Sequence, residues 1–176
     1  MISDWNYLTR AKNGDNEACE KIFHKYHNQL LNITAMITGS VDSAKDVVQE
    51  TFKRILEKRI THFEGSFKAY LTTTAYRLAL KEKYRRDRLI SDKQADNIDN
   101  YNVLDNHIID ETQKIVFSTI NAMKDTYKEI LVLRFYGNHS YEEISDILNV
   151  PIGTVKSRIF YAVKECRILL KKKGIL

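Results

Sequence analysis

The sequence predicts an all-α protein in which two small helical domains are joined by a flexible linker. Apolar residues recur at spacings of three and four through most of the chain, as in amphipathic helices. Six Gly and one Pro among 176 residues are too few for the many tight turns of a β-sandwich or barrel. A polar stretch rich in Asp and Asn interrupts the helical pattern after residue 90. We therefore predict domains over 1–90 and 108–176 and a linker over 91–107.

The composition is that of an ordinary globular protein. Hydrophobic residues make up 43% and charged residues 29%, which excludes wholesale disorder. No apolar run approaches the roughly 18 residues of a membrane span, and the first ten residues lack the apolar core of a signal peptide. Cys19 and Cys166 are too far apart in sequence for a CxxC zinc site and too few for a disulfide framework. We expect no membrane insertion and a reducing, cytoplasmic location.

The net charge of +5 is unevenly distributed along the chain. Residues 68–90 hold seven basic and two acidic side chains, and residues 156–176 hold seven basic and one acidic. Residues 91–112, between them, hold six acidic and one basic. Two basic segments indicate two contacts with a polyanion such as nucleic acid, although solvated helix faces produce similar runs.

Three helices are expected in the N-terminal domain. The first carries an apolar stripe from Ala18 to Ile37 and ends at Gly39-Ser40. Asp42 is placed to cap the second, whose inner face is Ala44, Val47, Val48, Thr51, Phe52 and Ile55. After a loop over 62–65, a long helix is expected from about Ser66 to Asp87, with Phe67, Tyr70, Leu71, Ala75, Leu78 and Ala79 inward.

Four helices are expected in the C-terminal domain. The first carries apolar residues from Ile115 to Met123, and the second runs from Asp125 to Tyr136 with Gly137 as its C-terminal cap. Ser140 and Glu143 form a capping-box pattern at the start of the third. The fourth begins near Ile152, and its inner side is Val155, Ile159, Ala162, Val163, Cys166, Leu169 and Leu170.

The last two helices predict a helix-turn-helix. A turn of three residues that holds the only proline, Pro151, separates a short helix from a longer basic one. The outer side of the second helix begins with small polar and basic residues, which suit contacts with base edges and phosphates. These residues are Gly153, Thr154, Lys156, Ser157 and Arg158.

Three motifs in the same order resemble bacterial sigma factors of the sigma-70 superfamily. SYEEIS...L..P.GTVKSR resembles their promoter-binding domain, and DSAKDVVQETF resembles their helix that binds core RNA polymerase. FEGSFKAYLTTTAYRLALKEKYRR resembles the strand-opening loop and the helix that reads the promoter −10 element. The short length and motif order match the extracytoplasmic-function (ECF) group, and the resemblance covers about residues 16–90 and 108–172.

This resemblance implies a transcription initiation factor without catalytic activity, metal or cofactor. It would bind core RNA polymerase, direct it to specific promoters and stabilise the melted −10 region, and an anti-sigma factor would be a further partner. The resemblance implies −35 contacts for Gly153, Thr154, Lys156, Ser157, Arg158, Phe160 and Tyr161. It implies −10 contacts for Phe63, Phe67, Arg77, Lys81, Tyr84, Arg85 and Arg88. Polymerase would be bound by Asp46, Gln49, Glu50 and Phe52, and its flap by Leu131, Phe135 and Tyr136.

Other interpretations remain at this point. Phe67 and Tyr70 also fit a helix core, and a core position suits most of the flap residues better than a flap contact does. A helix-turn-helix regulator that acts without core polymerase would share the C-terminal motif, although residues 1–90 show no ligand or phosphoacceptor domain. An enzyme is disfavoured because the chain lacks Walker, GxGxxG and GxSxG motifs. Tyr161 stands where many sigma factors carry a basic residue, so the promoter sequence stays open.

Overall fold

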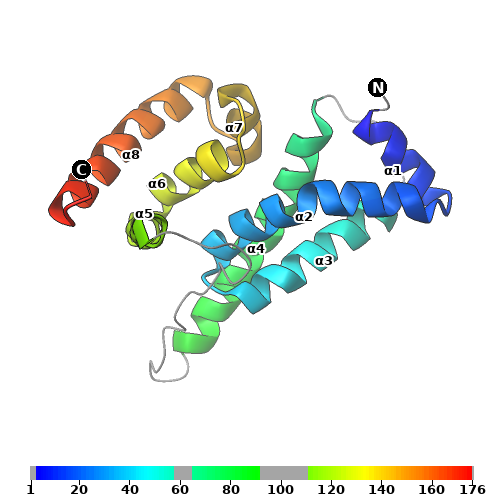
Figure 1. Ribbon diagram of the computed structural model, residues 1–176, viewed down its shortest axis with the longest axis horizontal. Helices are drawn as coiled ribbons and strands as arrows, with labels where there is room; N and C mark the ends of the chain where they lie inside the picture. Colours follow the sequence, from blue (N-terminus) through cyan, green and yellow to red (C-terminus); the bar gives the residue numbers. More distant parts are fainter. Residues whose placement is uncertain (1–2, 58–64, 92–110, 176) are drawn as a thin grey trace. The chain divides into compact units, whose positions relative to one another are not determined.

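In the computed structural model, which describes residues 3–57, 65–91 and 111–175, all the regular secondary structure is helical (Figure 1). The chain divides into two compact units, residues 1–101 and 102–176. The predicted linker lies, apart from Ser91, outside the described residues, and so does Phe63.

The first unit is built around one long helix. The helices are α1 (Asp4–Lys12), α2 (Asn16–Thr38), α3 (Val41–Glu57) and α4 (Phe67–Ser91). α1, α3 and α4 each pack against α2, which at 1.5 Å per residue is about 34 Å long. The last three helices confirm the sequence prediction, whereas α1 was not predicted.

Side-chain caps fix the starts of these helices. The Asp15 carboxylate accepts the Ala18 amide at 3.0 Å in front of α2, and the Ser66 hydroxyl accepts the Ala69 amide at 3.0 Å in front of α4. The predicted cap of α3 was wrong. Ser40, not Asp42, accepts the Ser43 amide at 3.3 Å, while Asp42 lies within the first turn with an exposed side chain. A carboxylate there still favours the helix through the helix dipole.

α1 is held to α2 by polar and aromatic contacts. The Asp4 carboxylate accepts hydrogen bonds from Lys25 Nζ at 2.7 Å and from the Tyr26 hydroxyl at 2.6 Å. Behind this anchor, the Trp5 ring packs edge-on against Phe67, with ring centroids 5.2 Å apart. The Phe67 ring also lies 5.5 Å from that of Tyr26. This cluster was hard to predict because α1 is short.

Phe67 is therefore a core residue, as the alternative interpretation allowed, and its ring is not available for the −10 contact that the resemblance implies. Only 3% of the residue is exposed, and Tyr70, one turn later, is also buried. Both belong to the cluster formed by α1, α2, α3 and α4. The first turn of α4 is thus an anchor in the core, and its surface-exposed residues begin further along the helix.

The second unit contains α5 (Glu111–Asn121), α6 (Asp125–Leu131), a π-helical turn η1 (Val132–Tyr136), α7 (Tyr141–Leu148) and α8 (Ile152–Lys172). α8 packs against α5, α6 and α7. The predicted helices are confirmed, but the expected single helix over 125–136 changes its winding at Val132. The Gly137 amide donates to the Val132 carbonyl, five residues back, at 2.9 Å.

Gly137 ends this helix as predicted, but without the left-handed conformation that is typical of a C-terminal glycine cap. Its place is set by tight packing instead. Its φ is −80°, and the left-handed residue is Asn138 with φ 47°. A Cβ atom on Gly137 would lie 2.6 Å from both the Leu133 carbonyl oxygen and the ring of the fully buried His139. His139 Nδ1 lies 3.0 Å from the Glu143 carboxylate, and Arg134 donates to the His139 carbonyl at 2.8 Å. This cluster fixes the entry into α7.

The helix-turn-helix is confirmed, including its capping box. The Ser140 hydroxyl accepts the Glu143 amide and the Glu143 carboxylate accepts the Ser140 amide, both at 3.1 Å. Asn149 ends α7 in the left-handed region with φ 53°. The Ser145 hydroxyl then donates to the Val150 carbonyl at 2.6 Å across the turn. The direction in which α8 leaves the turn is thus fixed by α7 itself.

Replacement of Phe67 by Ala should destabilise the protein by about 3–5 kcal/mol, because it leaves a cavity between Trp5, Tyr26 and α4. Urea unfolding followed by circular dichroism measures this loss. Tyr84→Ala, also on α4 but 59% exposed, is the matched control and should change stability by less than about 0.5 kcal/mol. Equal stabilities of the two variants would contradict the assignment of Phe67 to the core.

A pair of glycine substitutions tests the turn before the helix-turn-helix. Gly137→Ala should cost about 1–3 kcal/mol, because its Cβ atom would press on a backbone carbonyl and on the buried His139 ring. Gly153→Ala, in the first turn of α8, meets no atom within 4 Å and should stabilise the protein by about 0.5–1 kcal/mol. Thermal unfolding compares the two. A Gly137→Ala protein that melts with the wild type would show that this packing is not tight.

Candidate functional site

α8 separates into a core side and an outer side. Val155, Ile159 and Ala162 are buried, as predicted, and hold the helix on its unit. At 100° per residue, Gly153, Ser157, Phe160 and Tyr161 follow one another along the opposite side. All four are exposed in the structure. The outer side therefore consists of two small residues followed by two aromatic rings.

Two basic residues flank this outer row. Lys156 and Arg158 lie on either side of Ser157, each rotated by about 100° around the helix axis. Lys156 is exposed and Arg158 is half-buried, as is Thr154, whose carbonyl accepts the Ser157 hydroxyl at 3.0 Å. No side chain caps the N-terminus of α8 behind Pro151, and the positive end of the helix dipole favours an anion there. The structure brings all seven predicted −35 residues together.

α4 carries an exposed basic row on the side away from the core. Positions 77, 81, 84, 85 and 88 fall at spacings of three and four and cover about a quarter of the helix circumference. All five residues, Arg77, Lys81, Tyr84, Arg85 and Arg88, are exposed. We call them the α4 basic row. Phe67 and Phe63, the other predicted −10 residues, are not part of it.

Arg85, a member of this row, and its neighbour Arg86 both have partners within the unit. Arg85 forms an ion pair with Glu82 at 2.7 Å, and this pair holds the pKa of the Glu82 carboxyl below its usual value. Glu82 also accepts the Ser43 hydroxyl of α3 at 3.3 Å. Arg86 points the other way and donates to the Thr38 carbonyl at the end of α2, at 2.9 Å. Arg86 therefore supports the fold, whereas the α4 basic row remains on the surface.

α3 presents a polar row beside the α4 basic row. Asp46 and Gln49 are exposed, and Glu50 is partly exposed, with its carboxylate 2.6 Å from Arg54 Nε. Arg54 holds the pKa of the Glu50 carboxyl below its usual value, and Lys81 of α4 adds to this effect. The low pKa keeps Glu50 ionised at neutral pH. The three predicted polymerase-binding residues thus form an anionic, amide-bearing surface.

Phe52, the fourth predicted polymerase-binding residue, lies below this surface. It is 8% exposed, and its ring centroid is 5.0 Å from that of Phe23 on α2. Phe23 is 38% exposed and also lies 4.6 Å from the His27 ring. Phe52 in this position supports α3 rather than facing solvent. The exposure of Phe23 was not predicted, because its position fits the inner apolar stripe of α2.

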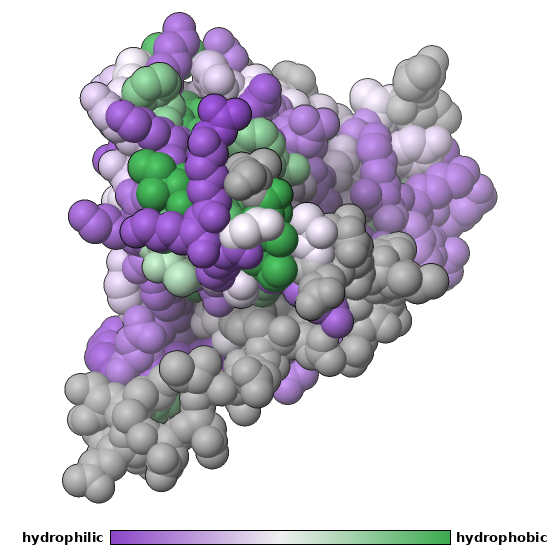
Figure 2. All heavy atoms as spheres, turned by 60° about the vertical axis from the view of Figure 1, so that its left-hand side comes forward, coloured by the Kyte–Doolittle hydropathy of each residue, from purple (hydrophilic) through white to green (hydrophobic). Residues whose placement is uncertain are grey.

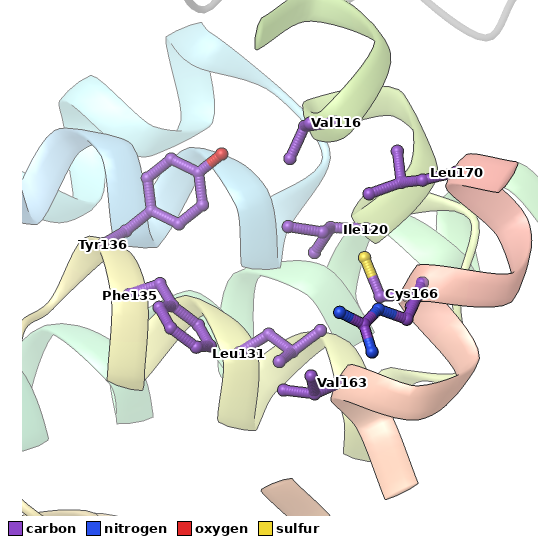
Figure 3. Close-up of a pocket in the computed structure, with 9 residues that line it drawn as sticks. Val116, Ile120, Leu131, Phe135, Tyr136, Val163, Cys166 and Leu170 are labelled. Carbon is purple, nitrogen blue, oxygen red and sulfur yellow. The ribbon is translucent and has the colours of Figure 1, made fainter. Parts of the chain in front are cut away.

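An apolar groove crosses the second unit (Figure 3). Its volume is about 420 Å³, and α5, α6, η1 and α8 all contribute to its wall. In Figure 2, hydrophobic residues on this unit lie between hydrophilic side chains on the face turned forward. The lining residues are Val116, Ile120, Leu131, Phe135, Tyr136, Val163, Cys166, Arg167 and Leu170. The structure thereby brings together Leu131, Phe135 and Tyr136.

One prediction about α8 was wrong at this groove, and burial beside the groove shifts the pKa of two side chains. Val163 was expected in the core but is 42% exposed, because the groove opens beside it. Phe135 is 63% exposed at the same groove. Burial raises the pKa of the Cys166 thiol and of the Tyr136 hydroxyl, so both stay protonated at neutral pH. The groove offers an apolar surface with Arg167 as its charged residue.

The described residues include no group of three His, Cys, Asp or Glu side chains placed to hold a metal ion. Cys19 and Cys166 are both free thiols. No helix among the described ranges is long and apolar enough to span a membrane.

Two sequence families match this chain, one in each unit. "Sigma-70 region 2" matches residues 22–89, which contain α3 and α4 with their exposed rows. "Sigma-70, region 4" matches residues 114–166, which contain the helix-turn-helix and most of the groove. Together these matches cover well over half of the chain.

Whole-length relatives agree with both matches. The ECF RNA polymerase sigma-E factor of Haemophilus influenzae is 30% identical, over 92% of each chain. The RNA polymerase sigma-H factor of Pseudomonas aeruginosa is 27% identical, over 90% of this chain and 89% of the relative. Among solved structures, the sigma factor RpoE of Bartonella quintana, in complex with the anti-sigma factor NepR, superposes with a TM-score of 0.68 at 24% identity. That match covers 86% of this chain and 96% of the other.

Both family matches and the whole-length relatives identify the same kind of protein. Sigma factors bind core RNA polymerase and promoter DNA to start transcription, and the polymerase carries out the chemistry. The protein is a sigma-70 family RNA polymerase sigma factor of the extracytoplasmic-function group, with regions 2 and 4 and no enzymatic activity of its own.

Proposed function

We propose that α8 reads the duplex −35 element with its outer side. The observation that supports this most strongly is the division of α8 into a core side and an outer side with small, aromatic and basic residues. DNA contacts there require no change in the fold. Gly153 and Ser157 allow the helix backbone to approach base edges, while Lys156 and Arg158 can reach the flanking phosphates or bases. The positive end of the helix dipole adds attraction for a phosphate.

The α4 basic row is proposed to hold the unpaired −10 strand. Proteins bind single strands with a positively charged surface that follows the backbone and with aromatic rings that stack on bases. Arg77, Lys81 and Arg88 supply the charge, and Tyr84, 59% exposed, supplies a ring. Arg85 can exchange its partner Glu82 for a phosphate. Phe63, which precedes α4 in the sequence, is a second candidate for stacking.

Core polymerase is proposed to bind two separate surfaces. The polar row of Asp46, Gln49 and Glu50, with Phe23 exposed nearby on α2, suits a coiled coil of the largest polymerase subunit. The groove suits an apolar helix of the flap of the other large subunit, because Phe135 and Val163 are exposed there and gain by being covered.

An anti-sigma factor is the further partner that we propose, and the cytoplasm is the proposed location. Two solved structures superpose with TM-scores of 0.68: the sigma factor RpoE in complex with the anti-sigma factor NepR, and CnrH in complex with the cytosolic domain of CnrY. The exposed apolar groove is a surface that a protein partner can cover in the free sigma factor. The two free cysteines are compatible with a reducing compartment.

Alanine at all three of Asp46, Gln49 and Glu50 should weaken binding to core polymerase by at least about tenfold, or 1.4 kcal/mol. Helical content should be retained, since Ala is the best helix former. Competition with the wild-type chain for core polymerase measures the effect. The control is Glu17→Ala with Lys21→Ala, which removes an exposed ion pair of α2. If the triple variant competes as well as this control, the polar row of α3 is only a solvated surface.

Two further variants should separate the promoter contacts. In the holoenzyme, Arg158→Ala should weaken binding to the −35 element by about 1–3 kcal/mol if the guanidinium contacts a base edge, and the −35 footprint measures this loss.

Arg77→Ala with Lys81→Ala should leave the −35 footprint intact and reduce the permanganate reactivity of thymines in the opened −10 region. A pre-melted template should then restore part of the transcription. Normal thymine reactivity in the α4 variant would refute its role in strand opening.

A further inference from the structure

The outer side of α8 carries two large aromatic rings that are not needed for the core. Phe160 is 64% exposed and Tyr161 is 54% exposed, although their neighbours Ile159 and Ala162 are buried. The two rings meet edge to face, with centroids 5.3 Å apart and planes at 80°. They do not line the groove of this unit. We call these two side chains the aromatic pair.

The position of the aromatic pair on α8 directs it toward base edges rather than phosphates. The pair follows Gly153 and Ser157 along the same side of the helix, where the backbone can lie deep in a groove. Lys156 and Arg158 lie about 100° to either side of Ser157, toward the walls of such a groove. When α8 occupies the major groove, the two cations therefore face the sugar-phosphate strands, and the aromatic pair faces the bases between them.

Base edges in the major groove offer one apolar group, the C5-methyl group of thymine. The Phe160 ring has no hydrogen-bonding atom, so an apolar contact is what it can add to recognition. We propose that the aromatic pair is a specificity determinant that contacts thymine methyl groups in the −35 element. This inference rests on the proposed binding of α8 to the −35 duplex.

The test begins with the holoenzyme, formed from the full chain and core polymerase. Promoter fragments with a randomised −35 region are selected for binding, and the common sequence is determined. We expect T·A pairs at one or two neighbouring positions that become variable when selection is repeated with the Phe160→Ala, Tyr161→Ala double variant. Both side chains are exposed, so this variant should fold normally.

Each such thymine is then replaced by uracil, which removes only the methyl group. Binding should weaken about fourfold per methyl group, the equivalent of about 0.8 kcal/mol for one buried carbon. Replacing the same thymine by cytosine should weaken binding, and 5-methylcytosine should restore about fourfold of that loss. Tyr161→Ala should bind thymine and uracil templates alike at the position read by Tyr161.

Two control variants define what the ring does. Tyr161→Phe keeps the ring and should keep the preference for thymine over uracil, whereas a loss equal to that of Tyr161→Ala would assign the contact to the hydroxyl and overturn the proposal. Ile168→Ala, exposed on the same helix two turns later, should change nothing.

Two outcomes separate this proposal from the function on which it rests. If the preferred −35 sequence binds equally well with uracil in place of thymine, the methyl contact alone is overturned. The same holds if uracil weakens binding equally in the wild type and in Tyr161→Ala. The aromatic pair would then be a surface for a protein. Failure to select any −35 sequence would overturn the assignment of α8 to the −35 element itself.

Discussion

The packing of three helices around α2 is the constraint on which the first unit depends. α1, α3 and α4 all contact α2, and its residues Ile22, Tyr26 and Leu30 belong to the buried cluster. Because α3 and α4 each bury one side here, their rotations about their own axes are fixed. The polar row of α3 and the α4 basic row can then occupy only the outer sides. The residues that α3 and α4 bury in the core thus determine which of their charged residues lie on the surface of this unit.

In the second unit, α8 provides both core residues and an exposed outer side. α8 closes the core with Val155, Ile159 and Ala162 and presents the exposed residues of its outer side from the same turns. Its placement depends on the cluster before it, where Gly137, His139 and Glu143 fix α7, and on the Ser145 bond across the turn. Core residues and binding residues alternate along the same helix without sharing side chains. Stability and DNA affinity can therefore change independently at neighbouring positions.

Most of this arrangement was predictable from the sequence because it depends on helical spacing and local caps. The helix-turn-helix and its capping box depend on residues close in the chain, and helical spacing alone marks Val155 and Ile159 as the inner side of α8. The errors arose where the deciding contact came from elsewhere. The ring of Phe67 is covered by Trp5 of a helix that was too short to predict, and Gly137 is restricted by the His139 ring rather than by its own φ.

The surfaces of single helices were likewise easier to predict than surfaces that several helices form together. The spacing of charged residues predicted the rows of α3 and α4 and the outer side of α8. It could not predict the groove, because Val116, Phe135 and Cys166 come from three separate helical segments. The apolar spacing placed Phe52 on the inner face of α3, where it lies, but did not show that the neighbouring Phe23 is exposed. Residue patterns define the faces of single helices, whereas concave surfaces appear only after the helices pack.

The location of the chain's single tryptophan gives the two units different optical signals. Trp5 lies against Phe67 and Tyr70 in the first unit, and the second unit holds no tryptophan. Indole fluorescence therefore follows the folding of regions around α1 and α4 alone, while the far-ultraviolet signal of helices follows both units. Coincidence of the two curves during denaturation would mean that the units unfold together, and separate midpoints would mean that each folds on its own. One ring thus makes the cooperativity between the two units measurable without any label.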